Sequence, residues 1–246
     1  MTDQAVAAAD LLAATWARGG AIDHLPEPLR PATVEAAMAI QAAFLRRHGS
    51  CGWKVGTHPS GSGWSGAPLR GPSLSSPHTL SAASAAGMRV EVEVALVLGR
   101  DIAAGAEMAD VRDAIAGTHV AFELFRSSYA DPARQDLPSL LADCLSNAGV
   151  VLGSGRAPRG DDRLEALHMA LTRDGEPLAS ADTGASLDAI VEAVHWLAQY
   201  AARLGAGLKR GAVILTGARI GPLPVARAGR YRADCALGEV RLGVGP

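Results

Sequence analysis

The fold prediction starts from one alternating stretch of the chain, Val90-Glu91-Val92-Glu93-Val94-Ala95-Leu96. A period of two predicts a β-strand, in which residues two apart project from the same face. Glu91 and Glu93 therefore point the same way, while the valines between them fill the opposite face. The run ends at Gly99, and we expect the strand to end there as well.

Two carboxylates on neighbouring positions of one face repel each other unless a positive charge lies between them. A third acid, Glu123, lies in another apolar, β-like run, His119 to Phe125. Acids offered by two such strands without His or Cys favour a hard divalent cation, Mg²⁺ or Mn²⁺. Spacing alone leaves a second interpretation open, in which the pair lies on a solvated sheet face and Glu123 is a surface or ion-pair residue.

The rest of the chain predicts an α+β protein, with helices first and many short strands afterwards. We expect helices from Ala5 to Trp16, from about Thr33 to His48, and from Leu187 to Leu204 with Ser186 as N-cap. The Gly- and Ser-rich segment from Pro59 to Gly71 is expected to be a long loop. Further strands or hairpins are predicted at 149–153, around the Asp174-Gly175 turn, at 212–215 and at 231–244.

Composition limits the classes of partner. The 246 residues carry a net charge of −2, which gives no reason to expect nucleic acid or an anionic membrane as a partner. No stretch approaches the roughly 18–20 apolar residues of a membrane span. The three cysteines have no CxxC spacing and the N-terminus has no secretory pattern, so we expect reduced thiols in a cytoplasmic protein.

A single lysine, Lys54, stands among apolar residues and glycines in the unit Gly52-Trp53-Lys54-Val55-Gly56. It is a candidate to pair with a substrate carboxylate or to act as a base with a lowered pKa. The alternative is a lysine whose ammonium extends from a strand into solvent. His58 and Trp64 follow in the Gly- and Ser-rich segment, where the histidine is either solvated or an acid–base group on a closing loop.

Several of these motifs, in this order, resemble the 2-keto-4-pentenoate hydratases of the fumarylacetoacetate hydrolase superfamily. The likeness covers nearly the whole chain and rests on WKVG at 53–56, GAPLRG at 66–71, VEVEVA at 90–95 with LGRD at 98–101, HVAFE at 119–123, LAD at 141–143 with Asn147, VVLG at 150–153, WLA at 196–198, VILTG at 213–217 and GPLPV at 221–225.

The resemblance implies a fumarylacetoacetate hydrolase-like mixed β-sandwich roll with a small helical N-terminal part. Residues 1–80 would form that helical part with its Gly/Ser/Pro-rich loop, and residues 81–246 the catalytic domain. The family's Mg²⁺ or Mn²⁺ ligands match Glu91, Glu93 and Glu123. The resemblance also implies a small 2-oxo acid substrate, a homo-oligomer, and a complex with a related decarboxylase.

Family residues outside the metal ligands map onto further positions. Lys54 and Asp143 are the expected catalytic residues, Lys54 for proton transfer or carboxylate pairing and Asp143 to orient Lys54 or a water. The expected substrate contacts are Lys54, Thr57, Leu69, Thr216 and Gly217. This chain departs from the family pattern at Arg126, Ser128, Cys144, Ala218 and Ile220. The last two replace hydroxyl side chains, which removes hydrogen-bonding groups from the expected substrate pocket.

The resemblance therefore implies a metal-dependent hydratase that adds water to a 2-hydroxy-2,4-dienoate and yields a 4-hydroxy-2-oxo acid. Three alternatives stay open, namely a decarboxylase or a C–C hydrolase of a 2-oxo acid at the same site, or a repurposed member that is not a hydratase. A distal carboxylate on the substrate would favour the decarboxylase and would need a cation. Arg70, Arg126 and Arg219 are the candidates, with Arg126 weakened by its odd spacing from Glu123.

Overall fold

The computed structural model describes residues 2–58, 61, 63–160, 162–225 and 228–245. Its helices are α1 Asp3–Ala17, η1 Glu27–Leu29, α2 Val34–His48, α3 Ala82–Ala85, α4 Met108–Ala114, η2 Pro132–Arg134, α5 Leu137–Ala142, η3 Cys144–Ser146, η4 Leu164–Ala166 and α6 Leu187–Arg203. Its strands are β1 Gly52–Thr57, β2 Trp64–Pro68, β3 Ser73–Ser75, β4 His78–Ser81, β5 Arg89–Leu98, β6 Ile115–Phe125, β7 Asn147–Arg156, β8 Met169–Arg173, β9 Glu176–Ala181, β10 Val213–Pro224, β11 Gly229–Cys235 and β12 Gly238–Gly245.

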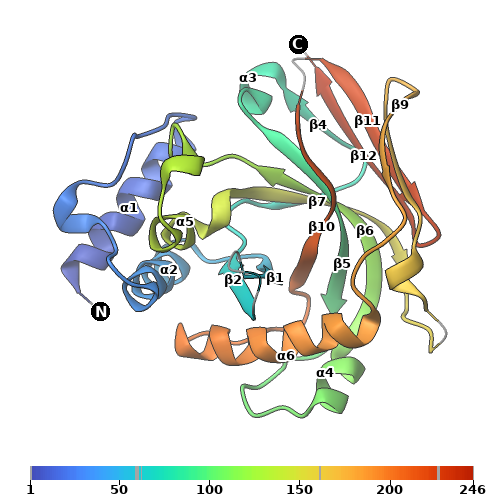
Figure 1. Cartoon of the computed structure of the whole chain (residues 1–246), viewed down its shortest axis with the longest axis horizontal. Helices are drawn as coiled ribbons and strands as arrows, with labels where there is room; N and C mark the ends of the chain where they lie inside the picture. Colours follow the sequence, from blue (N-terminus) through green and yellow to red (C-terminus); the bar gives the residue numbers. More distant parts are fainter. Residues whose placement is uncertain (1, 59–60, 62, 161, 226–227, 246) are drawn as a thin grey trace.

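The strands form two sheets that pack against each other (Figure 1). The seven-stranded sheet has the order β2-β1-β10-β5-β6-β7-β3, and the five-stranded sheet has the order β4-β12-β11-β8-β9. Apolar residues from both sheets fill the space between them, among them Val90, Val92, Leu124, Met169 and Val240. Burial of these side chains is the main stabilising contribution to the sandwich.

Strand β5 lies in the middle of the seven-stranded sheet, between β10 and β6. Its valines Val90, Val92 and Val94 are fully buried in the core between the sheets. The alternation seen in the sequence therefore directs Glu91 and Glu93 to the other face of this sheet. The predicted strand is confirmed; it begins at Arg89 and ends at Leu98, one residue before the expected end at Gly99.

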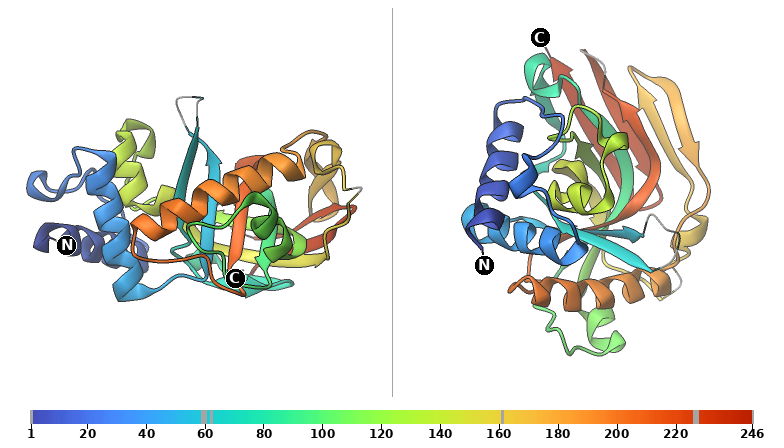
Figure 2. Two further views of the ribbon diagram at one scale, coloured as in Figure 1. Left: turned by 90° about the horizontal axis from the view of Figure 1, so that it is seen from below. Right: turned by 60° about the vertical axis from the view of Figure 1, so that its left-hand side comes forward.

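Helices cover the seven-stranded sheet and its outer edge. Helix α6 runs beneath β1, β2 and β10 (Figure 1) and buries the predicted stripe, including Ile190, Val194 and Leu197. The Ser186 side chain caps its N-terminus by accepting a hydrogen bond from the Ala189 amide at 3.2 Å. Helices α1, α2 and α5 pack together around a second apolar cluster, to one side of the sheets (Figure 2).

The α+β sandwich with an N-terminal helical part is confirmed, but the long loop expected from Pro59 to Gly71 is wrong. Residues 64–68 form β2, which pairs antiparallel with β1, while positions 59, 60 and 62 lie outside the described residues. Glycine at position 66 avoids a close contact with α6, because a Cβ there would lie 3.0 Å from Leu197 and 3.1 Å from Trp196. The composition that suggested a loop instead allows β2 to approach α6 closely.

The division at residue 80 stays a prediction. Strands β1, β2 and β3, all before that position, join the same sheet as β5 and β6. The three cysteines are free thiols, as expected. Among the described residues, none of the helices has the length and apolar character that crossing a membrane requires.

Candidate metal centre

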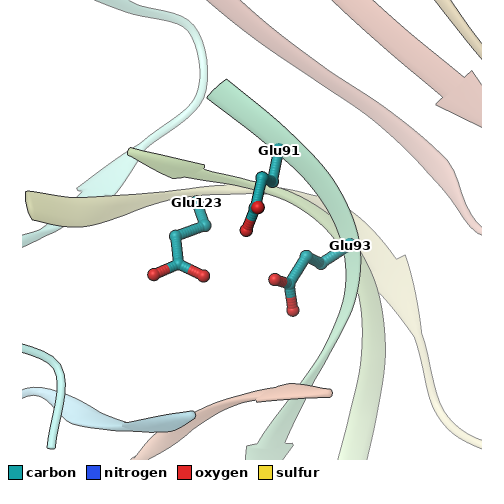
Figure 3. Close-up of side chains that lie close together, drawn as sticks. All are labelled: Glu91, Glu93 and Glu123. Carbon is teal, nitrogen blue, oxygen red and sulfur yellow. The ribbon is translucent and has the colours of Figure 1, made fainter. Parts of the chain in front are cut away.

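The register of the sheet brings the three predicted ligands together. Glu91 of β5 lies directly opposite Glu123 of β6, and directly opposed residues of antiparallel strands share a face. Glu93 is two residues further along β5 and projects from that same face. One carboxylate oxygen from each residue lies within 4.8 Å of the others, and all three side chains converge on one point (Figure 3).

This triad is buried, and its charges interact strongly. The exposed fractions of Glu91, Glu93 and Glu123 are 9%, 1% and 0%. Burial first, and then the charge of Glu123, raise the pKa of Glu91 to about 7 and raise the pKa of Glu93 well above its ordinary value. Carboxylates held this close without solvent favour the ionised form only when a cation lies among them.

Lys54 supplies one positive charge to the triad. It pairs with Leu215 of β10, which in turn lies opposite Ala95 of β5, so its side chain shares the face of Glu93. Its ammonium donates to both carboxylate oxygens of Glu123, at 2.7 and 2.8 Å. Burial alone would lower the pKa of Lys54, but the charges of the three glutamates outweigh burial and raise it. Lys54 is therefore an ammonium in this structure.

Strand β10 contributes a backbone contact to the triad. The Gly217 amide donates to Glu93 Oε2 at 2.8 Å, next to a register shift between Leu215 and Ala218. Gly217 has φ +105°, a backbone conformation that strongly favours glycine. The neighbouring Thr216 hydroxyl donates to the Val94 carbonyl at 2.8 Å, so this predicted substrate contact also ties β10 to β5.

Asn147 is a site residue to which the sequence analysis gave no role. Its side-chain oxygen accepts hydrogen bonds from the amides of Arg70 and Gly71, at 2.9 and 3.3 Å. Those two donors fix the orientation of the side-chain amide, so its NH₂ group faces Glu123 Oε1 and donates to it at 2.9 Å. Asn147 and Lys54 together hold the Glu123 carboxylate in place, in the way that outer hydrogen bonds orient metal ligands.

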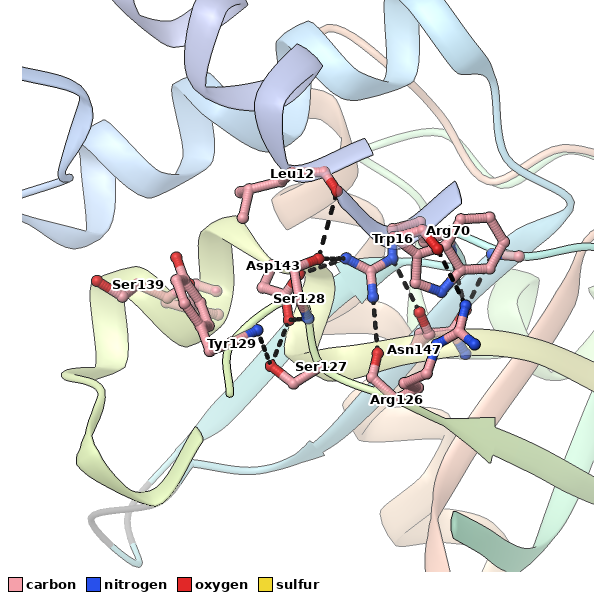
Figure 4. A network of polar contacts seen from close by, with 12 residues as sticks. Leu12, Trp16, Arg70, Arg126, Ser127, Ser128, Tyr129, Ser139, Asp143 and Asn147 are labelled. Carbon is pink, nitrogen blue, oxygen red and sulfur yellow. Dashed lines mark hydrogen bonds and ion pairs between the residues drawn. The ribbon is translucent and has the colours of Figure 1, made fainter. Parts of the chain in front are cut away.

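Asp143 lies in a polar network that includes Arg70 and Asn147 (Figure 4) and meets the triad through Asn147. Its carboxylate accepts from Arg70 Nη1, from the Ser127 hydroxyl at 2.8 Å and from the Ser128 amide at 3.0 Å. The predicted contact with Lys54 is not among the hydrogen bonds of the described residues. Asp143 instead neutralises Arg70, whose amide is one of the two donors that orient Asn147.

Thr57 and Leu69, two other predicted substrate contacts, lie in different surroundings. Thr57 is the last residue of β1 and is exposed. Leu69 is fully buried in a small apolar cluster with Ala95, Ala121 and Leu215, which lie on the same face of the sheet as the glutamates. Leu69 therefore packs against that face beside the triad, and Thr57 lies at the end of the β1–β2 hairpin.

The positions that depart from the family pattern do not share one environment. Ala218 lies opposite Glu93 and is exposed, so it faces the site, whereas Ile220 is buried in the core between the sheets. Ser128 donates to the Leu12 carbonyl at 3.3 Å, and its hydroxyl accepts from Arg70 Nη1 at 2.9 Å. Cys144 is 1% exposed, and burial raises the pKa of its thiol to about 12. Only Ala218 changes a side chain on the glutamate face.

The three candidate cations for a distal carboxylate all donate to backbone carbonyls. Arg70 donates to Asn147 and Arg126, and Arg126 donates to Trp16. Arg219 donates to Leu164 at 2.8 Å and to Ala185 at 3.1 Å. Burial lowers the pKa of Arg219, and the nearby charge of Glu93 opposes that effect. Arg219 is therefore close enough to the triad for its charge to interact with that of Glu93.

These residues fit a hard divalent cation. Three carboxylates and one ammonium leave two negative charges when all are ionised, and a divalent cation would balance them. Oxygen donors from three acidic residues are the ligands that Mg²⁺ and Mn²⁺ prefer, with remaining positions for water or substrate. Glu91, Glu93 and Glu123 are therefore the residues that would hold the metal.

The fold and this acidic site define the class of protein. Residues 62–241 match the family described as fumarylacetoacetate (FAA) hydrolase C-terminal, and the chain belongs to that family.

Curated relatives and a solved structure agree with this assignment. The chain is 40% identical to a 2-keto-4-pentenoate hydratase from Burkholderia vietnamiensis (strain G4 / LMG 22486), over 62% of this chain and 59% of the relative. It is 30% identical to a 4-oxalocrotonate decarboxylase from Pseudomonas sp., over 53% and 50% of the two chains. The chain thus spans less than two thirds of the curated relatives it matches. Its structure is similar to the 4-oxalocrotonate decarboxylase from Pseudomonas putida G7 complexed with magnesium and adipate, with a TM-score of 0.85, 20% identity and coverage of 100% and 99%.

Proposed function

We propose that this protein is a divalent-metal-dependent hydratase that adds water to a 2-hydroxy-2,4-dienoate and produces a 4-hydroxy-2-oxo acid. The observation that carries the proposal is the buried triad of Glu91, Glu93 and Glu123 with Lys54 bonded to it. The 40% identity to a 2-keto-4-pentenoate hydratase supports hydration as the reaction. We also propose Mg²⁺ or Mn²⁺ as the metal, and a homo-oligomer able to associate with a related decarboxylase.

Each residue has a role that follows from its contacts. When bound, the divalent cation supplies a Lewis acid for a 2-oxo carboxylate, whose enolate form develops negative charge. The Lys54 ammonium nitrogen lies 2.7 Å from Glu123 Oε1. This ammonium can pair with an anionic substrate or donate a proton to it. Asn147 keeps the Glu123 carboxylate fixed, and the Gly217 amide does the same for Glu93.

The surroundings of the triad limit access of bulk water. Leu69, Ala95, Ala121 and Val150 form a buried apolar floor. A low-dielectric floor strengthens the interaction of Lys54 with an anion. We propose Thr57, Thr216 and Gly217 as substrate contacts from the exposed side, and Asp143 as a positioning residue that acts through Arg70 and Asn147.

A second candidate is decarboxylation of a 2-oxo diacid at the same site. Three observations favour it. The first two are the 30% identity to a 4-oxalocrotonate decarboxylase and the position of Arg219, whose charge interacts with Glu93. Arg219 would then be the cation that accepts a distal carboxylate. The apolar Ala218 on the glutamate face offers no hydroxyl to position an attacking water, which also favours a reaction without hydration.

A screen of 2-oxo acids with Mg²⁺ and with Mn²⁺ tests both candidates. Absorbance of the dienol follows hydration, and CO₂ release follows decarboxylation. Glu93→Gln should abolish turnover in both assays while the fold is retained, because it removes one of three ligand charges. Activity that persisted in the presence of a chelator, or in Glu93→Gln, would falsify the metal-dependent mechanism.

A further inference from the structure

A cavity lies on the opposite side of the seven-stranded sheet from the metal centre. Its volume is about 430 Å³, and it lies among the end of α1, the strands β3 and β4, helix α3 and the end of β6. Leu124 lines it, whereas Glu123, the preceding residue of β6, faces the metal centre. Because successive strand residues point to opposite faces, the two sites are separated by the sheet.

The lining of this cavity combines apolar and cationic side chains. Leu74, Leu80 and Met88 contribute apolar surface, and the first two of these side chains are only half-buried. Arg18 and Arg126 contribute the two charges, and none of the described residues that line the cavity is acidic. A volume of this size lies within the range of small-molecule sites, roughly 300–1,000 Å³.

Arg126 carries a positive charge that no carboxylate among the described residues balances. Its guanidinium donates to the Trp16 carbonyl at 3.0 Å and lies 5.7 Å from the centre of the Trp16 ring. Its Nε is buried without a hydrogen-bond partner, and among the described residues it forms no ion pair. Arg70, which lies 5.4 Å from the same ring, differs because Asp143 neutralises it (Figure 4).

Arg18 adds a second charge without a partner at the same cavity. It is the C-cap residue of α1 and is exposed. In the described part of the chain it forms no ion pair either. A half-buried guanidinium without a counter-charge is unfavourable unless an anion binds it. Burial first, and then the nearby Arg70 guanidinium, lower the pKa of Arg126, in line with the partly buried position of its guanidinium.

We propose that this cavity binds a small organic carboxylate that carries an apolar group. The carboxylate would bind Arg126, with Arg18 at the rim, and the apolar group would pack on Leu74 and Leu80. An inorganic anion would leave the apolar wall without a contact, and a neutral apolar molecule would leave both charges unbalanced. This inference does not depend on the reaction at the metal centre.

Titration of the Mg²⁺-loaded protein with three probes tests the ligand class. Phenylacetate carries both features, phenylacetamide lacks the charge, and acetate lacks the apolar group. We expect phenylacetate to bind about tenfold or more tightly than either of the others, since each lacks one of two contacts worth about 1.4 kcal/mol or more. Calorimetry or ligand-detected NMR gives the dissociation constants. Equal binding of all three probes would overturn the proposal.

Variants assign the binding to this cavity. Arg126→Gln should weaken phenylacetate binding about tenfold, and Arg18→Gln, at an exposed position that leaves the fold intact, about threefold. Arg203→Gln, on the exposed end of α6, is the matched control and should bind as the wild type does. Phenylacetate binding that is unchanged in both Arg126→Gln and Arg18→Gln would overturn the proposal.

Two further measurements distinguish binding in this cavity from binding at the metal centre and from self-association of the chain. Glu93→Gln should bind phenylacetate like the wild type, because the cavity lies across the sheet from the triad. If Glu93→Gln loses phenylacetate binding while Arg126→Gln and Arg18→Gln keep it, phenylacetate binds at the metal centre and the proposed cavity site is refuted. If phenylacetate does not bind and Arg126→Gln changes the sedimentation coefficient, a second copy of the chain covers the cavity and the proposal fails.

Discussion

Replacing Lys54 by methionine tests whether its ammonium balances the buried carboxylates. Methionine keeps much of the side-chain volume but removes the charge that lies 2.7 Å from Glu123. The Glu123 side chain is fully buried and that of Lys54 is only 15% exposed, so the change leaves a buried carboxylate without its partner. Breaking such a pair costs about 3–5 kcal/mol. We expect the free energy of unfolding to fall by about 3 kcal/mol, at the lower end of this range, because solvent that reaches Lys54 weakens the pair.

Urea denaturation of the metal-free protein measures this loss. The double variant Lys54→Met/Glu123→Gln removes both charges, so it should recover most of the stability that the single variant loses. Lys209→Met is the matched control, because it breaks an exposed pair with Asp101 and should cost less than about 1 kcal/mol. A loss below about 1 kcal/mol for Lys54→Met, or no recovery in the double variant, would refute the role given to the ammonium.

Three further predictions concern strand packing, reaction choice and pH. Gly52→Ala would place a Cβ 1.9 Å from the Val213 carbonyl oxygen, whereas Gly56→Ala, on the same strand, meets nothing within 4 Å. Thermal unfolding should show that Gly52→Ala lowers the free energy of unfolding by about 2–3 kcal/mol and that Gly56→Ala lowers it by less than about 0.5 kcal/mol. Equal losses in the two variants would contradict the close contact between β1 and β10. Ala218→Ser should raise the ratio of hydration to CO₂ release about two- to tenfold, by adding a hydroxyl on the glutamate face; an unchanged ratio counts against that placement. The pKa of Glu91 is raised from 4.5 to about 7, so the metal-free folded state holds a proton that the unfolded chain releases. The stability that this bound proton contributes is fully present below about pH 4.5 and is lost as the pH rises through 7. Mg²⁺ should therefore raise the melting temperature more at about pH 8, where it does not compete with the proton, than at about pH 5. The reverse order would exclude Glu91 from the site.

Local patterns in the sequence were sufficient for much of the fold. Strand β5 and helix α6 were predicted because each separates apolar from polar side chains onto different faces, and that separation leaves a clear period in the sequence. The segment from Trp64 to Pro68 was missed because both its pairing with β1 and its contact with α6 depend on residues distant in the chain. A strand rich in glycine and serine has no pattern of its own that would reveal such partners.

The contrast between local patterns and contacts of distant residues also explains which site residues were predicted and which were missed. Glu91 and Glu93 were predicted to project together from the period of one strand, and their meeting with Glu123 required only two adjacent strands. The role of Asn147 was not predictable, because it depends on the amides of Arg70 and Gly71, more than seventy positions away in sequence. Asp143 was expected to orient Lys54 or a water, and its carboxylate binds Arg70, a contact between distant residues that no local pattern indicates.

The support that β10 gives to Glu93 has a consequence for how such a protein diversifies. Strand β10 holds this carboxylate through the main-chain amide of Gly217, a group that does not change when neighbouring side chains do. Under the proposed function, substitutions at Ala218 would therefore alter which molecule is accepted without dismantling the acidic centre. A lineage that duplicates this gene would then have one strand on which new substrate preferences arise by single mutations, while the acidic residues of β5 and β6 are preserved.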